Sequence, residues 1–293
     1  MKTLKKCFSL AGGRKSGLSF ATLVICGIIL LAVPLQISCS DSGDDNGDST
    51  VGATLEGGGD GVKAALAEGV TYKNVDKLMI AVPEKEFSIL ATEVTQELYK
   101  SVMGENPSNF KEEKNLPVEK VSWYDAVVFC NKLSAKCGLT PVYAVDGETD
   151  VEKWGYAPHK GEEITTTVRQ NKNVDGYRLP TVEEWQYAAK GGQEFEYSGS
   201  GNLDEVGWYS ENSGKKTHPV AQKDPNGYGL YDMSGNVCEW CWNSHIDHSE
   251  NRCNCGGGWY GSAYFCGVGF KCWDYADSTS NYLGFRIVRS TGK

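Results

Sequence analysis

The chain has 293 residues, of which 40% are hydrophobic and 23% charged, and its formal net charge is −9. An acidic surface repels phosphate backbones, so this balance excludes nucleic acid as an expected partner. The length accommodates one large domain together with additional segments.

Residues 1–39 have the pattern of an export signal. A basic beginning, with five Lys or Arg and no acidic residue, precedes the apolar run FATLVICGIILLAVPL. This run is shorter than the ~20 residues that a membrane-spanning helix needs, so we interpret it as a signal peptide. The following LQISCS resembles a bacterial lipobox, in which Cys39 would be lipidated and become the new N-terminus. A signal that is only cleaved is the alternative.

Lipidation would attach the protein to a bacterial membrane through its lipid anchor alone. We therefore expect an exported monomer at the outer membrane or the cell surface. Removal of residues 1–39 leaves 24 basic and 38 acidic side chains, a net charge of −14.

Residues 40–69 are rich in Gly, Asp and Ser and contain no aromatic side chain. Such a segment buries too little apolar area to offset its ordering entropy, so we expect a flexible tether. The folded domain is expected over 70–293.

Three helices are indicated by their capping residues. The first follows Thr95 in TQELYKSVMG, and the second follows Ser122, with Asp125 three residues later. The third follows Thr181, with Glu184 in capping-box spacing. The remaining chain is short extended pieces between turns, such as GYRLP, VGWYS, THPVAQK, YGLYDM and GFRIV. This pattern predicts an irregular α+β domain with long ordered loops.

Six stretches resemble the formylglycine-generating enzyme (sulfatase-modifying factor) family, and they follow in the family's order from about residue 85 to 289. They are ATEVTQELYKSVMGENPSNF, LPVEKVSWYDAVVFCNKLS, GLTPVY, GYRLPTVEEWQYAAKGG, WYSENSGKKTHPVAQKDPNGYGLYDMSGNVCEWCW and GFRIV. The resemblance implies a variant of the C-type lectin fold, with few helices and many short strands. Fold alone does not decide function.

The resemblance bears directly on catalysis. In the family's enzymes, two cysteines past a Gly-Gly-Ser-aromatic element bind copper(I) and oxidise a sulfatase cysteine. Here the element is GGGW, the second cysteine matches Cys266, and the first position is Gly261. Glycine cannot ligate a soft metal ion, so we expect no enzyme and no required cofactor. A formylglycine-generating oxidase that uses Cys266, with Cys253, Cys255 or Cys272 in place of the missing cysteine, is the alternative.

The segment of about 238–286 departs from the family in a particular way. It keeps frame residues such as Gly256, Gly257, Trp259 and Phe285, while Tyr, Gly, Ser, Phe, Cys and Asp stand between them. This pattern resembles the variable proteins of diversity-generating retroelements, in particular spirochaete variable lipoproteins of the TvpA type. That resemblance implies a diversified, ligand-binding C-terminal segment.

The composition of the segment supports a contact surface, since aromatic side chains supply contact area and small polar ones adapt around them. The ligand would be a protein or another surface molecule; a structural lipoprotein with one fixed partner is a further alternative. We expect Trp240, Trp259 and Phe285 in the core. The expected face comprises Trp242, His245, Tyr260, Gly261, Ser262, Tyr264, Phe265, Phe270, Trp273, Tyr275 and Tyr282.

One metal site is also suggested by the resemblance. GNVCEW resembles a family segment that contributes to a calcium site, which would involve the side-chain oxygens of Asn236 and Glu239. Hard oxygen ligands suit calcium, so a structural calcium ion is a possibility to test.

Overall fold

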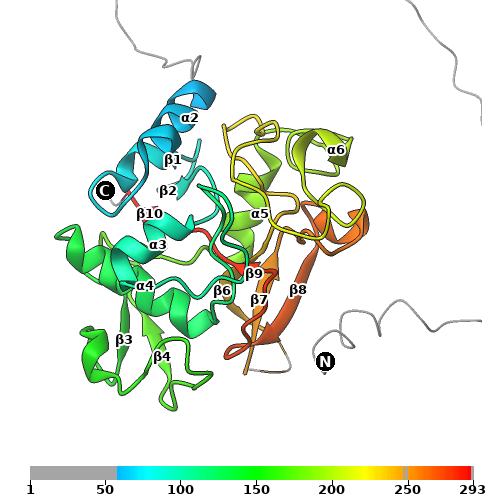
Figure 1. Ribbon diagram of the computed structural model, residues 1–293. Coiled ribbons are helices and arrows are strands. Elements are labelled where there is room, and N and C mark those ends of the chain that lie inside the picture. Colours follow the sequence, from blue (N-terminus) through cyan, green and yellow to red (C-terminus); the bar gives the residue numbers. More distant parts are fainter. Residues whose placement is uncertain (1–57, 247, 249, 292–293) are drawn as a thin grey trace, which may run out of the picture. The chain divides into compact units, whose positions relative to one another are not determined.

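The structure is a computed structural model, which describes residues 58–246, 248 and 250–291 (Figure 1). The expected signal peptide, Cys39 and the tether up to residue 57 lie outside the described residues. Within the described part, no helix is long and apolar enough to cross a membrane.

The domain starts earlier than the sequence predicted. Helix α2 (Gly58–Glu68) lies where the second half of the tether was expected. Its Val62, Ala65 and Leu66 follow helical spacing and are all buried in the main core. The tether prediction was therefore wrong for residues 58–69, because three apolar residues on one helix face suffice to dock this segment.

The three predicted helices are confirmed. Helix α3 (Gln96–Met103) is capped by Thr95 and ends at Gly104, which adopts a left-handed conformation. Helices α4 (Trp123–Lys136) and α5 (Val182–Lys190) both begin with a full capping box. Sequence reasoning missed the short α6 (Leu203–Val206) and the 3₁₀ turns η1 (Val75–Leu78), η2 (Val151–Lys153) and η3 (Ala263–Cys266).

The strands form three small sheets, as expected for an α+β domain. One has the order β1-β2-β10-β5, from β1 (Met79–Ala81), β2 (Phe87–Leu90), β10 (Val288–Ser290) and β5 (Tyr177–Arg178). A second pairs β3 (Tyr143–Val145) with β4 (Val168–Gln170). The third has the order β8-β7-β6-β9, from β8 (Lys271–Tyr275), β7 (Asn251–Cys255), β6 (Cys238–Ser244) and β9 (Leu283–Gly284).

The third sheet carries the candidate site. Figure 1 shows β7 and β8, in orange, beside β6. Its strands β6, β7 and β8 are antiparallel, while β6 pairs with β9 in parallel. Glu239 and Cys241 lie on the face that α5 covers with Trp185, and Trp240 lies on the opposite face toward α4. Strand β6 is thus packed between two hydrophobic clusters, one on each face of the sheet.

The predicted segments VGWYS, THPVAQK and YGLYDM are ordered loops rather than strands. Their backbone groups pair with other loops instead of a neighbouring strand, as in the Tyr231 N–H donating to the Ala91 carbonyl. Tyr231 is also buried. Apolar composition correctly indicated burial, but it could not indicate which backbone partner each segment finds.

Candidate binding face

The loop after β7 is fixed by its glycines. Gly256 and Gly257 both have positive φ, at +89° and +67°. A Cβ on Gly257 would stand 2.7 Å from the Phe265 carbonyl oxygen and 2.8 Å from the Cys266 sulfur. The loop therefore folds back tightly on η3, and only glycine fits at this position.

Trp259 lies at the rim of the core and not inside it. Its indole nitrogen donates to the Asn281 carbonyl oxygen at 2.9 Å, and its ring meets Phe110 edge-on at 5.6 Å. The residue is partly exposed, whereas Trp240 and Phe285 are fully buried as predicted. Trp259 therefore supports the loop from its edge.

Three aromatic side chains gather on the far side of this loop. The ring centroids of Tyr264, Phe265 and Phe270 lie 5.1–5.5 Å apart, each pair meeting edge to face. Tyr264 is 71% exposed, Ser262 beside it is exposed, and the two phenylalanines are half-buried. We call Tyr264, Phe265 and Phe270 the outer aromatic cluster.

A second group lies along the edge strand β8. Trp273 packs against His245 at 4.4 Å between ring centroids, and Tyr275 is 43% exposed. Trp273 and Tyr275 share one face of β8 because they alternate with Asp274. Ile246, which is 94% exposed, stands next to His245 in sequence and was not predicted as part of the site.

The remaining predicted face residues are turned inward, which corrects the sequence prediction. Tyr282 is buried at 9% exposure and packs against Tyr260 at 4.3 Å, and Gly261 is buried as well. Trp242 is partly buried between Trp123 and Tyr143, with ring centroids 5.3 and 5.1 Å away. The pairing register of β6 shifts between Trp240 and Ser244, and this shift affects the direction of the side chains between them. A bulge of that kind has no clear sequence signal.

The geometry around Cys266 does not suit the copper chemistry of the family's enzymes. Cys266 has a free thiol that is fully buried, and burial raises its pKa to about 12. A metal-binding or nucleophilic cysteine has to be a thiolate. Position 261 supplies no second sulfur. Cys241 and Cys255 lie with their sulfurs 3.9 Å apart, but both are fully buried in the core under α5.

Asn236 and Glu239 do not form a shared calcium site. The Glu239 carboxylate accepts hydrogen bonds from Arg286 Nε and Nη2 and from Trp185 Nε1. Asn236 Oδ1 accepts from the His218 N–H, and its amide donates to Glu93. These oxygens already accept hydrogen bonds from protein groups, so Asn236 and Glu239 do not fit a calcium site. The described residues also contain no group of three His, Cys, Asp or Glu able to hold a metal.

Sequence reasoning missed two polar residues of the same sheet, Asp274 and Asn254. Asp274 of β8 is 7% exposed and accepts a hydrogen bond from Asn254 Nδ2 at 3.2 Å. Burial raises the Asp274 pKa to about 6. A single carboxylate among 38 acidic residues has no sequence pattern that marks it as buried.

Two hollows in the described surface, of about 470 and 830 Å³, lie elsewhere. Neither is lined by any residue of 238–286; the first includes Lys132 and Glu152, and the second includes Asp76 and Arg289. The two hollows therefore do not belong to the candidate face, from which Tyr264 and Tyr275 project.

Comparison with known proteins finds relatives of more than one kind. The chain is 39% identical to the chaperone protein LppX of Paenibacillus barcinonensis over 290 residues, covering 90% of this chain and 97% of the relative. It is 32% identical to the formylglycine-generating enzyme of Streptomyces coelicolor over 146 residues, which cover 39% of this chain and 46% of the enzyme.

Among solved structures, Treponema denticola variable protein 1 matches with a TM-score of 0.65 and 35% identity, over 73% of this chain and 91% of that one. This likeness confirms the predicted resemblance to variable proteins. The sulfatase-modifying factor enzyme 1-like domain matches residues 65–291. The chain therefore belongs to the family of sulfatase-modifying factor enzyme 1-like domains, and its fold is the C-type-lectin-like variant of that family.

Proposed function

We propose that this protein is a ligand-binding lipoprotein displayed at a bacterial surface, with segment 238–286 as a diversified binding face. The observation that carries the proposal is the outer aromatic cluster, in which Tyr264 projects 71% of its surface beside the glycine-framed loop. Likeness to a variable protein supports a binding role, and likeness to the chaperone protein LppX is consistent with one.

The physical basis is that of a paratope. Tyrosine and phenylalanine bring large contact areas with few rotatable bonds, so they lose little entropy on binding. The cluster stands on η3, whose position is set by Gly257 and by the Ser234 hydroxyl donating to the Cys266 carbonyl oxygen. Rigid support beneath exposed rings reduces the ordering cost of association. The expected ligand is a protein or another surface molecule, with no cofactor required and the chain acting as a monomer.

A fixed partner is the second candidate, because the relative with 39% identity over nearly its whole length is named a chaperone protein. A chaperone that serves one client keeps one contact surface. This candidate uses the same exposed residues and differs only in whether they vary between isolates.

The deciding experiment is to sequence the last ~60 codons of the gene from many independent isolates. Diversification predicts changes at positions such as 260, 262, 264, 265, 270, 273 and 275, with 256, 257, 259 and 284–286 constant. A tail that is identical in every isolate would refute the diversified face and leave the fixed partner.

A separate assay addresses the oxidase alternative. The purified protein is loaded with copper(I) and incubated with oxygen and a peptide carrying a sulfatase-type cysteine motif. We expect no aldehyde by mass spectrometry, because Gly261 replaces one metal-binding cysteine and Cys266 is buried. Conversion of the cysteine would overturn the binding proposal.

A further inference from the structure

Strand β8 forms one edge of the sheet that carries the candidate face. The strand order is β8-β7-β6-β9, so β8 has a hydrogen-bonded neighbour on one side only. Figure 1 shows this strand in orange, on the outer side of β7. In an edge strand, the N–H and C=O groups of alternate residues point away from the sheet. The register identifies which residues of β8 these are.

Two backbone hydrogen bonds establish the pattern. The Ala276 N–H donates to the Glu250 carbonyl oxygen, so these opposite residues are a hydrogen-bonded pair that continues the β7–β8 ladder. The His245 N–H donates to the Asn251 carbonyl oxygen, so Asn251, the register partner of Tyr275, directs this group toward β6 and away from β8. Hydrogen-bonded and non-hydrogen-bonded pairs alternate along an antiparallel ladder. Both bonds give the same phase.

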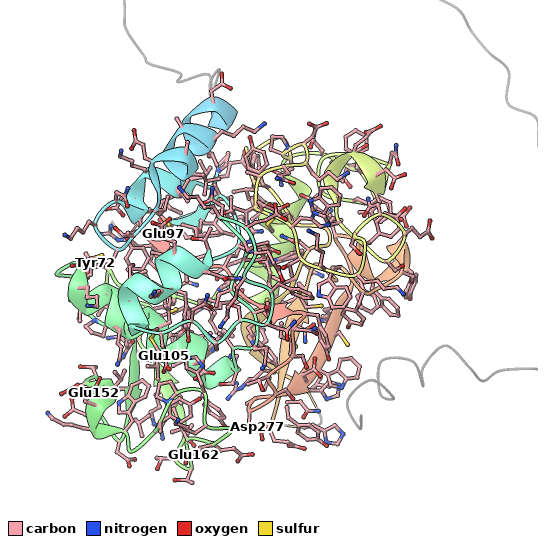
Figure 2. All side chains as sticks on the ribbon, in the orientation of Figure 1. Tyr72, Glu97, Glu105, Glu152, Glu162 and Asp277 are labelled. Atoms are coloured by element: carbon pink, nitrogen blue, oxygen red, sulfur yellow. The ribbon has the colours of Figure 1, made fainter. Side chains whose placement is uncertain are left out.

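The outward backbone groups of β8 therefore belong to Lys271, Trp273 and Tyr275. The Tyr275 carbonyl oxygen accepts from the Ser278 N–H at 2.9 Å, across the turn with Asp277 that Figure 2 labels, so the edge ends there. Among the residues that the structure describes, no backbone group pairs with the outward N–H or C=O of Lys271 or Trp273. These groups repeat at about 7 Å, the length of two extended residues.

The side chains along this edge are accessible. Lys271 is exposed, and Tyr275 is 43% exposed. Trp273 is partly exposed and packs against His245 at 4.4 Å between ring centroids. The three side chains of β8 share one face of the sheet because alternate residues of a strand point the same way. Phe270 of the outer aromatic cluster directly precedes Lys271, so the edge continues the candidate face.

We propose that β8 is a docking edge for an extended polypeptide segment of the ligand, which adds to the sheet as a further strand. Donors and acceptors that repeat every two residues match another extended backbone, whose main chain supplies affinity and whose alternate side chains supply specificity. Apolar side chains of the ligand would pack on Trp273 and Tyr275, and a carboxylate would face Lys271. A second copy is disfavoured because two chains of net charge −9 repel each other. This inference rests on the proposed binding function and names its ligand as a polypeptide.

Amide hydrogen exchange of the purified full-length protein, resolved by NMR, tests whether the edge is open. The N–H groups of Cys272 and Asp274 face β7 and are bonded within the ladder. We expect the N–H groups of Lys271 and Trp273 to exchange at least tenfold faster than those two. Equal protection of all four amides would show that the edge is covered, and the proposal would then be wrong.

The ligand class is tested with a phage library of random linear nonapeptides, selected on the same full-length protein. Binding of the enriched peptides is measured by fluorescence polarisation. We expect bound peptides to protect the Lys271 and Trp273 amides from exchange, and their sequences to carry apolar residues at alternate positions. A library without enriched peptides, or peptides that leave both amides unprotected, would overturn the docking edge.

Two substitutions at one exposed position separate the backbone contact from the side chain. Lys271→Ala removes the side chain and keeps the outward N–H, whereas Lys271→Pro removes both. Because this N–H faces away from β7, proline breaks no hydrogen bond of the sheet. Peptides should bind Lys271→Pro at least fivefold more weakly than Lys271→Ala, since one acceptor of the peptide loses its partner. Equal affinities would refute the backbone contact.

The same comparison in the middle of the strand guards against a variant that does not fold. Trp273→Pro should likewise bind peptides more weakly than Trp273→Ala, and thermal unfolding identifies which variants are folded. Sedimentation of the free protein distinguishes the ligand from a second copy. We expect a monomer; a dimer that Lys271→Pro dissociates would show that β8 pairs with itself, and the ligand assignment would be wrong.

The docking edge and the proposed function fail separately. A closed edge together with a variable gene tail leaves the diversified binding face intact. Peptide docking on β8 together with a uniform tail leaves a polypeptide ligand of the fixed-partner kind.

Discussion

Arg286 and Glu239 form a two-pronged ion pair at the centre of the domain. Arg286 Nε and Nη2 each donate to a different oxygen of Glu239 at 2.7 Å, and neither side chain is exposed. Arg286 Nη1 and Nη2 also donate to the carbonyl oxygens of Leu90 and Tyr231. One guanidinium thus connects the β8-β7-β6-β9 sheet, the β1-β2-β10-β5 sheet and the loop that contains Tyr231.

Breaking this pair should lower the free energy of unfolding substantially. Glu239→Gln removes the countercharge and leaves Arg286 buried and unpaired, which costs about 3–5 kcal/mol. Urea denaturation followed by circular dichroism measures the loss. Glu250→Gln, at an exposed residue, is the control and should change stability by less than about 0.5 kcal/mol. A loss below about 1 kcal/mol for Glu239→Gln would contradict the central role of the pair.

The exposed and buried tyrosines of the face should respond in opposite ways to truncation. Tyr264→Ala removes a ring that is 71% exposed, so unfolding free energy should change by less than about 0.5 kcal/mol while ligand binding falls. Tyr282→Ala empties a buried site and should cost about 3 kcal/mol. Thermal unfolding of both variants checks this; equal destabilisation would show that Tyr264 is a structural residue.

Asp274 should make folding stability depend on pH. Its pKa is raised to about 6 in the folded protein and is about 3.9 when unfolded, so the folded state binds more protons between these values. The contribution of Asp274 to the free energy of unfolding is therefore fully present below about pH 4 and is lost as pH rises through 6. Wild-type stability relative to Asp274→Asn should fall by about 1–3 kcal/mol between pH 4 and pH 7.5 in urea titrations. The opposite slope would place Asp274 next to a cation.

Buried thiols of the C-terminal region should resist alkylation in the folded protein. Burial raises the pKa of Cys238, Cys241 and Cys266, so their thiolate populations at pH 8 are very small. Iodoacetamide followed by peptide mass spectrometry should modify these three only after unfolding in urea. Cys137 is partly exposed and should react earlier. Rapid labelling of Cys266 in the folded protein would revive the oxidase alternative.

Local signals predicted the helices well, because each capping box acts within three or four residues of its own sequence. Thr181 and Glu184 are an example, and both of their predicted hydrogen bonds are present. Helix α2 was missed because its glycine-rich start resembles a linker. The helix is stabilised by packing of Leu66 against the main core, which is a tertiary contact.

The binding face was only partly predictable, because the direction of each side chain depends on strand register. Composition indicated a contact surface that included Tyr264, which is exposed, but it also included Tyr282, which the fold buries. The shift in β6 after Trp240 and the pairing of β7 with β8 determine these directions. The resemblance identified the family, while Asp274 emerged only from its burial in three dimensions.

The tight approach of Gly257 to Cys266 and the Phe265 carbonyl limits how a population of such proteins can evolve. A side chain introduced at codon 257 would collide with these atoms and strain the backbone, so it would destabilise the loop whatever residues surround it. Useful variation must therefore be confined to codons that flank an unchanging one. Under the proposed diversification, the number of folded variants that a lineage can sample is set by how accurately mutation is targeted, as much as by how many positions are free.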